Sequence, residues 1–399
     1  MEAPIPTTPR PDWKLWAPLL LMALGACLLA AWATAPSGPG VCPDGRTYLT
    51  SARLLSQGQG YVDYPRGDDW LDPEPVTQFP PLYPLLLAAG HGVGLQGPEG
   101  ARMLQLALLL ANICLLGWFT ASAMASRAAG WMAAGLFASA PAFLYVHLWV
   151  WSEPLCTLLL LGCLLGLEQL EQGCRRAWLW AALCCALALL TRFAALSMLL
   201  AGCGLLLVGQ GSLRARLFRS AVFGAIGTLV FAAWLLRNSL VAGEATAFEL
   251  HTALMPEELP QALHTIGQWA LPLPVWFGFK LATAALLFGW LAAAFRHAAR
   301  TPAEQRTPGQ RLAVMGGTLA LTHFMFVLAA RRVVGTALEP NDRILGPSLL
   351  GLILLAVGAT PPRWRPVGAL LALLWLAGSI MLAAYVRSEG LAYLGANWR

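Results

Sequence analysis

The sequence predicts an all-α polytopic membrane protein with about 11 transmembrane helices and one long polar loop after the first of them. Of its 399 residues, 58% are hydrophobic and only 12% are charged, whereas soluble domains carry about 25% charged residues. Apolar runs of membrane-spanning length recur along the chain. The long polar segment, Cys42 to Leu95, directly follows the first run and holds six acids: Asp44, Asp63, Asp68, Asp69, Asp72 and Glu74.

A transmembrane helix needs roughly 17 to 25 mainly apolar residues. The sequence offers eleven such segments, at about 15–34, 101–122, 128–147, 153–170, 177–191, 193–209, 218–237, 274–295, 311–330, 343–359 and 367–385. The segments 177–191 and 193–209 meet at Thr191-Arg192 and are individually short. The first segment is too long and too uncharged for a cleaved signal peptide, so we expect it to be a retained span.

The polar loop has order of its own. Pro43-Asp44 precedes a predicted helix with Tyr48, Ala52 and Leu55 on one face, and Gly58-Gln59-Gly60 ends it. This pattern favours a helix on the membrane surface. The apolar run from Leu82 to Leu95 is too short to span and predicts a re-entrant or interfacial segment.

The positive charges predict the orientation. The net charge of +6 does not indicate nucleic-acid binding, because the arginines sit in short loops between apolar runs. With the N-terminus inside, the inner segments carry 14 Arg and Lys and five acids, and the rest of the chain carries 12 and 15. Positive residues concentrate on the cytoplasmic side of membrane proteins. We therefore expect a multi-pass protein of the inner (plasma) membrane with its polar loop outside.

We expect residues 1–399 to form a single membrane domain, with extracytoplasmic loops at 35–100 and 238–274 and no soluble C-terminal domain. The nine cysteines lie mostly in apolar segments, where cysteine behaves as a small hydrophobe. Their spacing fits neither a zinc site nor a disulfide framework. Nothing in the sequence indicates the oligomeric state.

Two carboxylates are the candidate catalytic residues. Asp44 comes soon after the first span, and Glu153 opens the segment after Trp149-Val150-Trp151-Ser152. Asp44 also suits a helix N-cap, and Pro154 makes Ser152 or Glu153 a natural cap. However, a carboxylate beside hydrocarbon is costly and is a functional candidate by default.

Four cations are candidate phosphate ligands. Arg192, Arg237 and Arg343 lie at outer ends of predicted helices, and Lys280 lies about a turn and a half inside the span 274–295. A guanidinium donates two parallel hydrogen bonds to a phosphate. Each of these side chains could instead extend along its helix to lipid headgroups.

A divalent cation is left open as a cofactor, and if one binds we expect Glu249 and His251 to hold it. A solvated loop histidine is the competing interpretation of His251. We expect His147 and His323, on predicted membrane helices, to be packed polar residues rather than metal ligands. We expect Tyr48, Tyr83 and Arg53 of the outer loop to contact the acceptor.

The order of these features resembles the GT-C class of polytopic glycosyltransferases, in particular bacterial relatives of protein O-mannosyltransferases and the aminoarabinose transferase of lipid A. The matching motifs run through nearly the whole chain: Pro43-Asp44…Tyr48…Ala52…Leu55…Gly58, Phe79-Pro80-Pro81-Leu82-Tyr83-Pro84, Ala101-Arg102, Ser152-Glu153-Pro154-Leu155, Thr191-Arg192, Phe248-Glu249-Leu250-His251 and Asp342-Arg343…Pro347.

The resemblance implies an inverting-type transfer of a sugar from a polyprenyl-phosphate donor to an acceptor hydroxyl on a lipid, glycan or protein, at the outer face of the membrane. Two departures bear on the site. Gly45 stands where the family often has a second acid, and Gln78-Phe79 stands where some members have Glu-Lys. Both remove a charge that the family uses, and the second removes a carboxylate that can bind metal.

Two other functions stay open at this point. A transporter or lipid flippase would place ionisable residues near the bilayer midplane and tend to show internal repeats, whereas here they cluster at helix ends and no repeat is visible. A non-catalytic subunit for assembly of an envelope polysaccharide is the second alternative. The sequence does not identify the sugar, the acceptor or partner enzymes.

Overall fold

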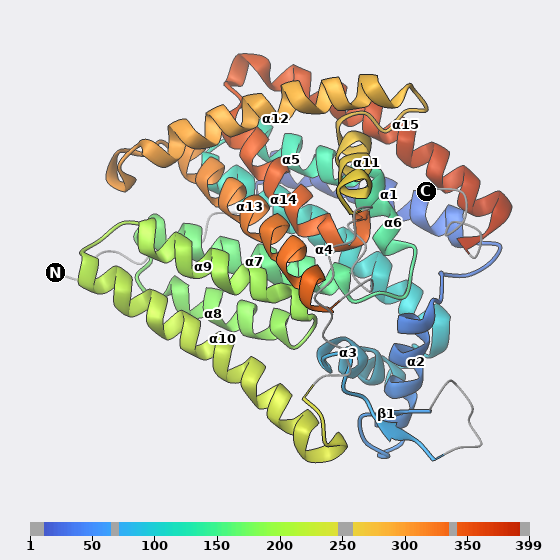
Figure 1. The fold of residues 1–399 in the computed structure, drawn as a ribbon. Coiled ribbons are helices and arrows are strands. Elements are labelled where there is room, and N and C mark those ends of the chain that lie inside the picture. Colours follow the sequence, from blue (N-terminus) through green and yellow to red (C-terminus); the bar gives the residue numbers. More distant parts are fainter. Residues whose placement is uncertain (1–11, 65–71, 246–257, 335–340, 392–399) are drawn as a thin grey trace.

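A computed structural model of the chain describes residues 12–64, 72–245, 258–334 and 341–391 (Figure 1). The described residues form helices throughout, with two short strands. The longer helices, in chain order, are α1 (Trp13–Thr34), α2 (Pro43–Ser56), α3 (Leu82–His91), α4 (Gly97–Met124), α5 (Arg127–Ser139), α6 (Pro141–His147), α7 (Glu153–Glu171), α8 (Ala177–Leu189), α9 (Leu196–Val208), α10 (Leu213–Ala242), α11 (Glu258–Ala270), α12 (Phe277–Arg300), α13 (Pro308–Val334), α14 (Asp342–Ala359) and α15 (Arg365–Glu389).

The remaining elements are short. Three 3₁₀ turns precede α9, α13 and α15: η2 (Phe193–Ala195), η3 (Ala303–Gln305) and η5 (Pro362–Trp364). Strands β1 (Val62–Asp63) and β2 (Glu74–Pro75) pair antiparallel. The ribbon shows α2, α3 and β1 together at one edge of the helical bundle (Figure 1).

Eight of the described helices are long and apolar enough to cross a membrane, and the pair α5 and α6 makes a ninth if it counts as one broken span. The expected segments 177–191 and 193–209 appear as α8 and as η2 with α9, which are helical but shorter than the other spans. Each of the eleven expected apolar segments is thus helical, and the polytopic all-α fold class is confirmed.

The break between α5 and α6 lies within the expected span 128–147. The two helices meet at an angle of 61°. Ala140, between them, is extended at φ −73° and ψ 122°, and Pro141 opens α6. Proline has no backbone N–H and disfavours helical geometry in the residue before it, so the helix ends at Ser139 and restarts in a new direction.

The two juxtamembrane helices form as the sequence predicts. Helix α2 begins at Pro43 and ends at Ser56, just before Gly58. Its apolar face, with Tyr48 and Ala52, packs against Tyr83 and Leu87 of α3. Helix α3 has only ten residues, which agrees with a segment too short to span.

Helices α13 and α14 pack with their backbones in contact, and this fixes the position of the start of α14. A Cβ atom on Gly316 would lie 2.4 Å from the carbonyl oxygen of Gly351, and one on Gly309 would lie 2.6 Å from that of Gly358. Small residues allow such close approach between membrane helices. Any larger side chain at these positions would push α14 away from α13.

His323 of α13 also holds the beginning of α14. Its Nε2 lies 2.8 Å from the Ile344 carbonyl oxygen, and its Nδ1 lies 2.7 Å from Ser197 Oγ of α9. His147 contacts the carbonyl oxygen of Phe143 within its own helix. Both histidines are buried, so their interpretation as packed polar residues is confirmed.

Candidate active site

Four charged side chains from four parts of the sequence meet at one end of the helical bundle. Arg343 of α14 donates through Nε to Glu153 Oε1 of α7 and through Nη2 to Asp44 Oδ2 of α2. Arg192, between α8 and η2, lies 2.8 Å from the same Glu153 oxygen through Nη1. The sequence predicted a functional role for each of the four, and the structure brings them together in a cluster of two acids and two arginines.

The members of this cluster differ in exposure. The Glu153 side chain is 8% exposed, whereas that of Asp44 is 26% exposed. Arg192 and Arg343 lie between these values. Glu153 Oε2 is buried and has no hydrogen-bond partner among the described residues. A buried carboxylate oxygen without a partner is costly, so Glu153 offers an acceptor to a ligand.

The first turn of α2 is held against the segment before α7. Gly40 and Trp149 form an isolated parallel bridge, in which Val150 N donates to Gly40 O at 2.8 Å. At Gly45 a Cβ atom would lie 3.0 Å from the Val150 carbonyl oxygen. A second acid at position 45 would therefore make a tight contact with this backbone, which would have to shift by a few tenths of an ångström.

Asp44 does not cap α2. Cys42 occupies the N-cap position without a side-chain cap, and Pro43 follows it in the first turn. Asp44 lies within the first helical turn, where the helix dipole favours a negative charge. The interpretation of Asp44 as an N-cap is wrong, because the N-cap lies two residues earlier, at Cys42. Its carboxylate is directed to Arg343 instead.

Ser152 links the cluster to the buried tyrosines. Its Oγ lies 3.2 Å from Arg192 Nη1 and 3.2 Å from the Tyr48 hydroxyl. The Tyr83 hydroxyl accepts a hydrogen bond from Gln105 Nε2 at 2.9 Å. The two tyrosine rings meet edge to face at 5.2 Å.

Tyr48 and Tyr83 are 1% and 0% exposed. Burial raises the pKa of both phenols well above the ordinary value, and for Tyr48 the nearby Arg192 opposes this only in part. Both hydroxyls therefore stay protonated. In the structure the Tyr48 hydroxyl contacts Ser152 and the Tyr83 hydroxyl accepts from Gln105. The expected contacts of both tyrosines with the acceptor stay a prediction.

The guanidinium of Arg343 lies over a stacked pair of tryptophan rings. The guanidinium carbon of Arg343 lies 4.2 Å from the centre of the Trp151 ring, which stacks on Trp149 at 5.0 Å. Such a cation–π contact orients the guanidinium plane. Gln105 Nε2 fixes the backbone of both tryptophans through their carbonyl oxygens. Sequence reasoning missed this role of Trp151 and Gln105, because interfacial tryptophans are common in membrane proteins and Gln105 lies within an apolar run.

The structure does not bring the other predicted residues to this cluster. Arg237 donates to the carbonyl oxygens of Val76 at 2.7 Å and Tyr61 at 3.3 Å, next to the small sheet. Lys280 Nζ donates to Gln268 Oε1 at 2.9 Å. Arg53 is exposed and lines a separate surface pocket near His91. Glu249 and His251 lie outside the described residues.

No three of the described His, Cys, Asp and Glu residues are grouped so that they could hold a metal ion. Asp44 and Glu153 are both engaged by Arg343, and its guanidinium fills the place where a cation bridging the two carboxylates would sit. The described residues of the cluster therefore do not fit a divalent ion.

A pocket opens directly beneath the cluster. It has a cavity volume of about 20 Å³ and lies between α6, α7, η2 and α14, with Glu153, Arg192 and Arg343 in its lining. Its other walls are mainly apolar, among them Phe143, Leu160 and Pro347. A ligand with a charged head and an apolar tail matches this combination.

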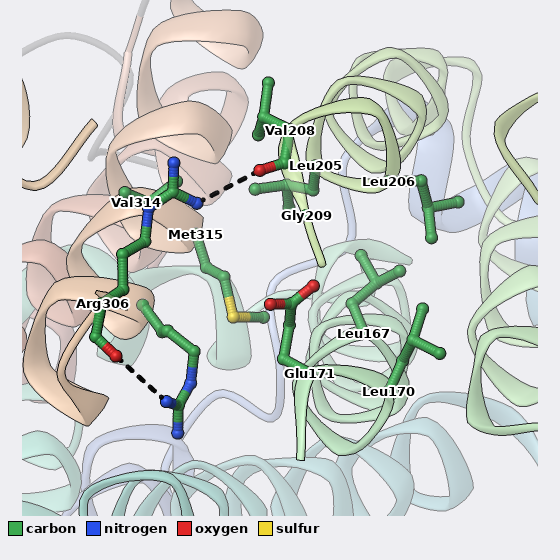
Figure 2. A pocket seen from close by; sticks show the side chains of 11 residues that line it. Leu167, Leu170, Glu171, Leu205, Leu206, Val208, Gly209, Arg306, Val314 and Met315 are labelled. Carbon is green, nitrogen blue, oxygen red and sulfur yellow. Dashed lines mark hydrogen bonds between the residues drawn. The ribbon is translucent and has the colours of Figure 1, made fainter. Parts of the chain in front are cut away.

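The far end of α7 carries a different set of charges. The 19 residues of this helix extend roughly 28 Å at 1.5 Å per residue, close to the hydrocarbon thickness of a bilayer of about 30 Å. There Glu168 pairs with Arg311 at 3.3 Å. Figure 2 shows Glu171, Arg306 and leucines of α7 and α9 around a pocket at this end.

A second ion pair belongs to segments that the charge bias placed inside. Asp12, ahead of α1, pairs with Arg127 of α5 at 2.5 Å. This hydrogen bond holds the pKa of Asp12 below its ordinary value. Arg306, Arg311 and this pair all belong to segments that the charge bias predicts to be cytoplasmic.

No protein-family model and no curated protein matches this chain. Its fold does match solved structures. The arabinofuranosyltransferase AftD from Mycobacteria superposes with a TM-score of 0.56 over 92% of this chain and 27% of its own, at 21% identity. ArnT from Cupriavidus metallidurans bound to undecaprenyl phosphate superposes with a TM-score of 0.57 over 97% of this chain and 67% of its own, at 17% identity.

A third match is the archaeal oligosaccharyltransferase AglB from Archaeoglobus fulgidus, in complex with an inhibitory peptide and a dolichol-phosphate, with a TM-score of 0.50 and 12% identity over 94% of this chain and 56% of its own. These proteins are GT-C membrane glycosyltransferases, so the chain has a GT-C-like fold and the resemblance is confirmed at that level. The chain spans about a quarter of AftD and about two thirds of ArnT.

Proposed function

We propose that this protein is a membrane glycosyltransferase that moves a sugar from a polyprenyl-phosphate donor to a hydroxyl of a lipid, glycan or protein at the outer face of the membrane. The observation that carries the proposal is the cluster in which Arg343 bridges Asp44 and Glu153 while Arg192 binds Glu153. It combines donors for a phosphate with a carboxylate that can accept a proton.

The arginines supply the phosphate site. Among the described residues, Arg343 Nη1 and Arg192 Nη2 make no hydrogen bond to protein, and both side chains line the pocket beneath the cluster. When the sugar leaves, the phosphodiester becomes a monoester and gains negative charge, which guanidinium groups stabilise without titrating. The apolar walls of the same pocket suit the polyprenyl chain.

Asp44 supplies the base. The acceptor oxygen forms a bond to the anomeric carbon as the bond from that carbon to the phosphate oxygen breaks, and the hydroxyl proton passes to Asp44. Asp44 is the more exposed of the two acids, and Glu153 is held by two arginines. Attack opposite the phosphate would invert the anomeric centre, and Glu153 Oε2 would accept a hydroxyl of the donor sugar.

The comparisons support the choice of carrier. ArnT was solved with undecaprenyl phosphate and AglB with dolichol-phosphate. The shared helical fold, together with the arginines that line the pocket of this chain, supports a polyprenyl phosphate here also. The proposed sidedness rests on the charge bias, which puts the cluster outside and the Arg306 end of the bundle in the cytoplasm.

The test is transfer of radiolabel from a crude polyprenyl-phosphate-sugar pool in membranes with and without the protein. We expect label to reach a lipid, glycan or protein fraction only when the protein is present. A flippase would instead move labelled donor across the bilayer without consuming it. An assembly subunit would show transfer only when a second enzyme is added back.

A further inference from the structure

A second pocket lies on the other side of the α14 N-terminus from the charged cluster. It has a cavity volume of about 100 Å³ and is bounded by α11, the start of α6, α14 and α15. Ligand pockets combine apolar walls with a few placed polar groups. Here the indole rings of Trp269 and Trp375 form part of the wall.

The polar groups of this pocket have unused hydrogen-bonding capacity. Asp342 Oδ1 accepts from Trp269 Nε1 at 2.7 Å, and within the described part of the chain its Oδ2 has no partner. Asn341 uses its side-chain oxygen to cap α14, which leaves its amide nitrogen as a donor. His264 and Gln268 of α11 contact each other at 3.3 Å and line the same pocket.

The charges around this pocket disfavour a phosphate. Asp342 is the acid in its lining. Burial lowers the pKa of His264, and Lys280, which donates to Gln268, lowers it further. Both influences keep the imidazole neutral. A ligand with several neutral hydroxyl groups, which donate to Asp342 and accept from Asn341, fits these groups better than an anion.

Adjacent residues of α14 contribute to the pocket and to the charged cluster. Asp342 and Arg343 are consecutive, and consecutive helical residues do not share a face. Asp342 contacts α11, and Arg343 contacts α2 and α7. Tyr145 belongs to α6, whose first residues line the pocket, and its ring packs edge to face on that of Trp151 at 5.5 Å. The Trp151 ring in turn contacts the guanidinium of Arg343.

We infer that this pocket binds a sugar ring of the substrate through its hydroxyl groups, next to the charged cluster. The inference rests on the proposed function and adds a recognition site to it. Asp342, Asn341, His264 and Gln268 would hydrogen-bond the hydroxyls, and the tryptophans would contact the ring carbons. The ring belongs to the donor or to a glycan acceptor, which share this chemistry.

The test uses the full chain in nanodiscs and a panel of methyl pentosides and methyl hexosides, with binding followed by saturation-transfer NMR. In Asp342→Asn the new amide oxygen still accepts from Trp269, and in His264→Phe the ring still stacks on Phe277. We expect at least a tenfold weaker binding of the preferred glycoside in both variants. The control is Glu99→Gln, an acid-to-amide change at an exposed site with a 69% exposed side chain, and it should bind as the wild type does.

Three outcomes separate the possibilities. Absence of glycoside binding, or equal binding by all four proteins, overturns the inference even if transfer activity is found. Weaker binding in the two variants, with polyprenyl phosphate alone bound within twofold of wild type, supports it even if no transfer is detected and the proposed function fails. Where transfer is measurable, a higher KM for the donor identifies a donor subsite, and a higher KM for the acceptor identifies an acceptor subsite.

Discussion

Arg343 and Asp44 are 299 positions apart in the sequence, yet a guanidinium nitrogen of one donates directly to a carboxylate oxygen of the other. The same arginine binds Glu153. One residue thus connects the starts of α2, α7 and α14. In the proposed reaction the donor phosphate binds the guanidinium nitrogen of Arg343 that these carboxylates leave free.

Arg343→Ala and Arg192→Ala should weaken binding of polyprenyl phosphate. Hydrogen bonds to charged groups contribute about 1.5 to 3 kcal/mol, so we expect a loss of about 10- to 100-fold in affinity. Lysine at either position should restore it only in part, because an ammonium lacks the planar fork of a guanidinium. Binding of radiolabelled lipid to the purified protein measures this.

Arg387→Ala is the matched control, since Arg387 is an exposed arginine at the C-terminal end of α15 that contacts Trp32. It should leave lipid binding unchanged. If both alanine variants of the cluster fold normally and bind the lipid as tightly as wild type, the phosphate site lies elsewhere.

The proposed orientation can be checked with a native cysteine. Cys174 is exposed in the turn after α7, while the other cysteines are buried or half-buried. In intact cells, a membrane-impermeant thiol reagent should leave Cys174 unlabelled and should label it after permeabilisation. Cysteines introduced at 175 and 303 should behave in the same way, whereas those at 65 and 257 should label in intact cells.

The variant Cys174→Ser provides the background for this experiment. Labelling of Cys174 in intact cells, or protection of position 65, would invert the topology. It would also place Asp44 in the cytoplasm and remove the proposed function at the outer face.

The helices could be predicted from sequence because length and hydropathy are local properties. The segments that became α4 and α7 show this, since continuous apolar runs of that length have no stable alternative in a bilayer. The sequence also indicates Asp44, Glu153, Arg192 and Arg343 as candidate functional residues, because charge at a membrane helix end is costly and rare.

Which charged side chains of the site pair with one another could not be predicted from the sequence. Nothing local to Arg343 indicates that its partners are Asp44 and Glu153 rather than lipid headgroups, since the contact depends on how α13 and α14 pack through Gly316 and Gly351. Likewise, Arg237 resembles Arg192 in sequence position. Its carbonyl partners at Val76 and Tyr61 come from a loop 161 and 176 positions earlier in the sequence.

Arg237→Ala should destabilise the protein more than it affects lipid binding. It removes the donor to two backbone oxygens and a guanidinium that packs on Trp234 at 5.1 Å. Leaving such acceptors unpaired costs about 1 to 3 kcal/mol. We expect a lower melting temperature and faster proteolysis between Tyr61 and Val76, with polyprenyl phosphate bound within twofold of wild type. Reduced lipid binding at an unchanged melting temperature would instead support the role of Arg237 as a phosphate ligand.

Chelation should have little effect on transfer. Arg343 already neutralises Asp44 and Glu153, and Gln78 is uncharged where some relatives carry an acid. Treatment of the purified enzyme with a chelator should therefore retain most of the initial rate. Loss of activity that a divalent cation restores would contradict this and would direct attention to Glu249 and His251, first as single alanine variants.

Asp44→Asn should abolish most of the transfer activity and leave the fold intact. Asparagine keeps the shape of the side chain and an oxygen that accepts from Arg343, and Asp44 does not cap α2. It cannot take a proton from the acceptor. Loss of a general base lowers the rate by about 10²- to 10⁴-fold, so kcat should fall by that amount while the melting temperature changes little.

Comparing Glu153→Gln with Asp44→Asn distinguishes a residue that stabilises the cluster from one that takes part only in catalysis. Glu153 is 8% exposed on its side chain and binds two arginines, and removing one charge from a buried ion-pair network costs about 3 to 5 kcal/mol. That variant should lose thermal stability as well as activity, with weaker binding of the lipid phosphate because Arg192 and Arg343 lose their common partner. Asp44→Asn should bind the lipid normally. If Asp44→Asn transfers sugar at the wild-type rate, Asp44 is not the base, and Glu153 is the carboxylate left to take the proton.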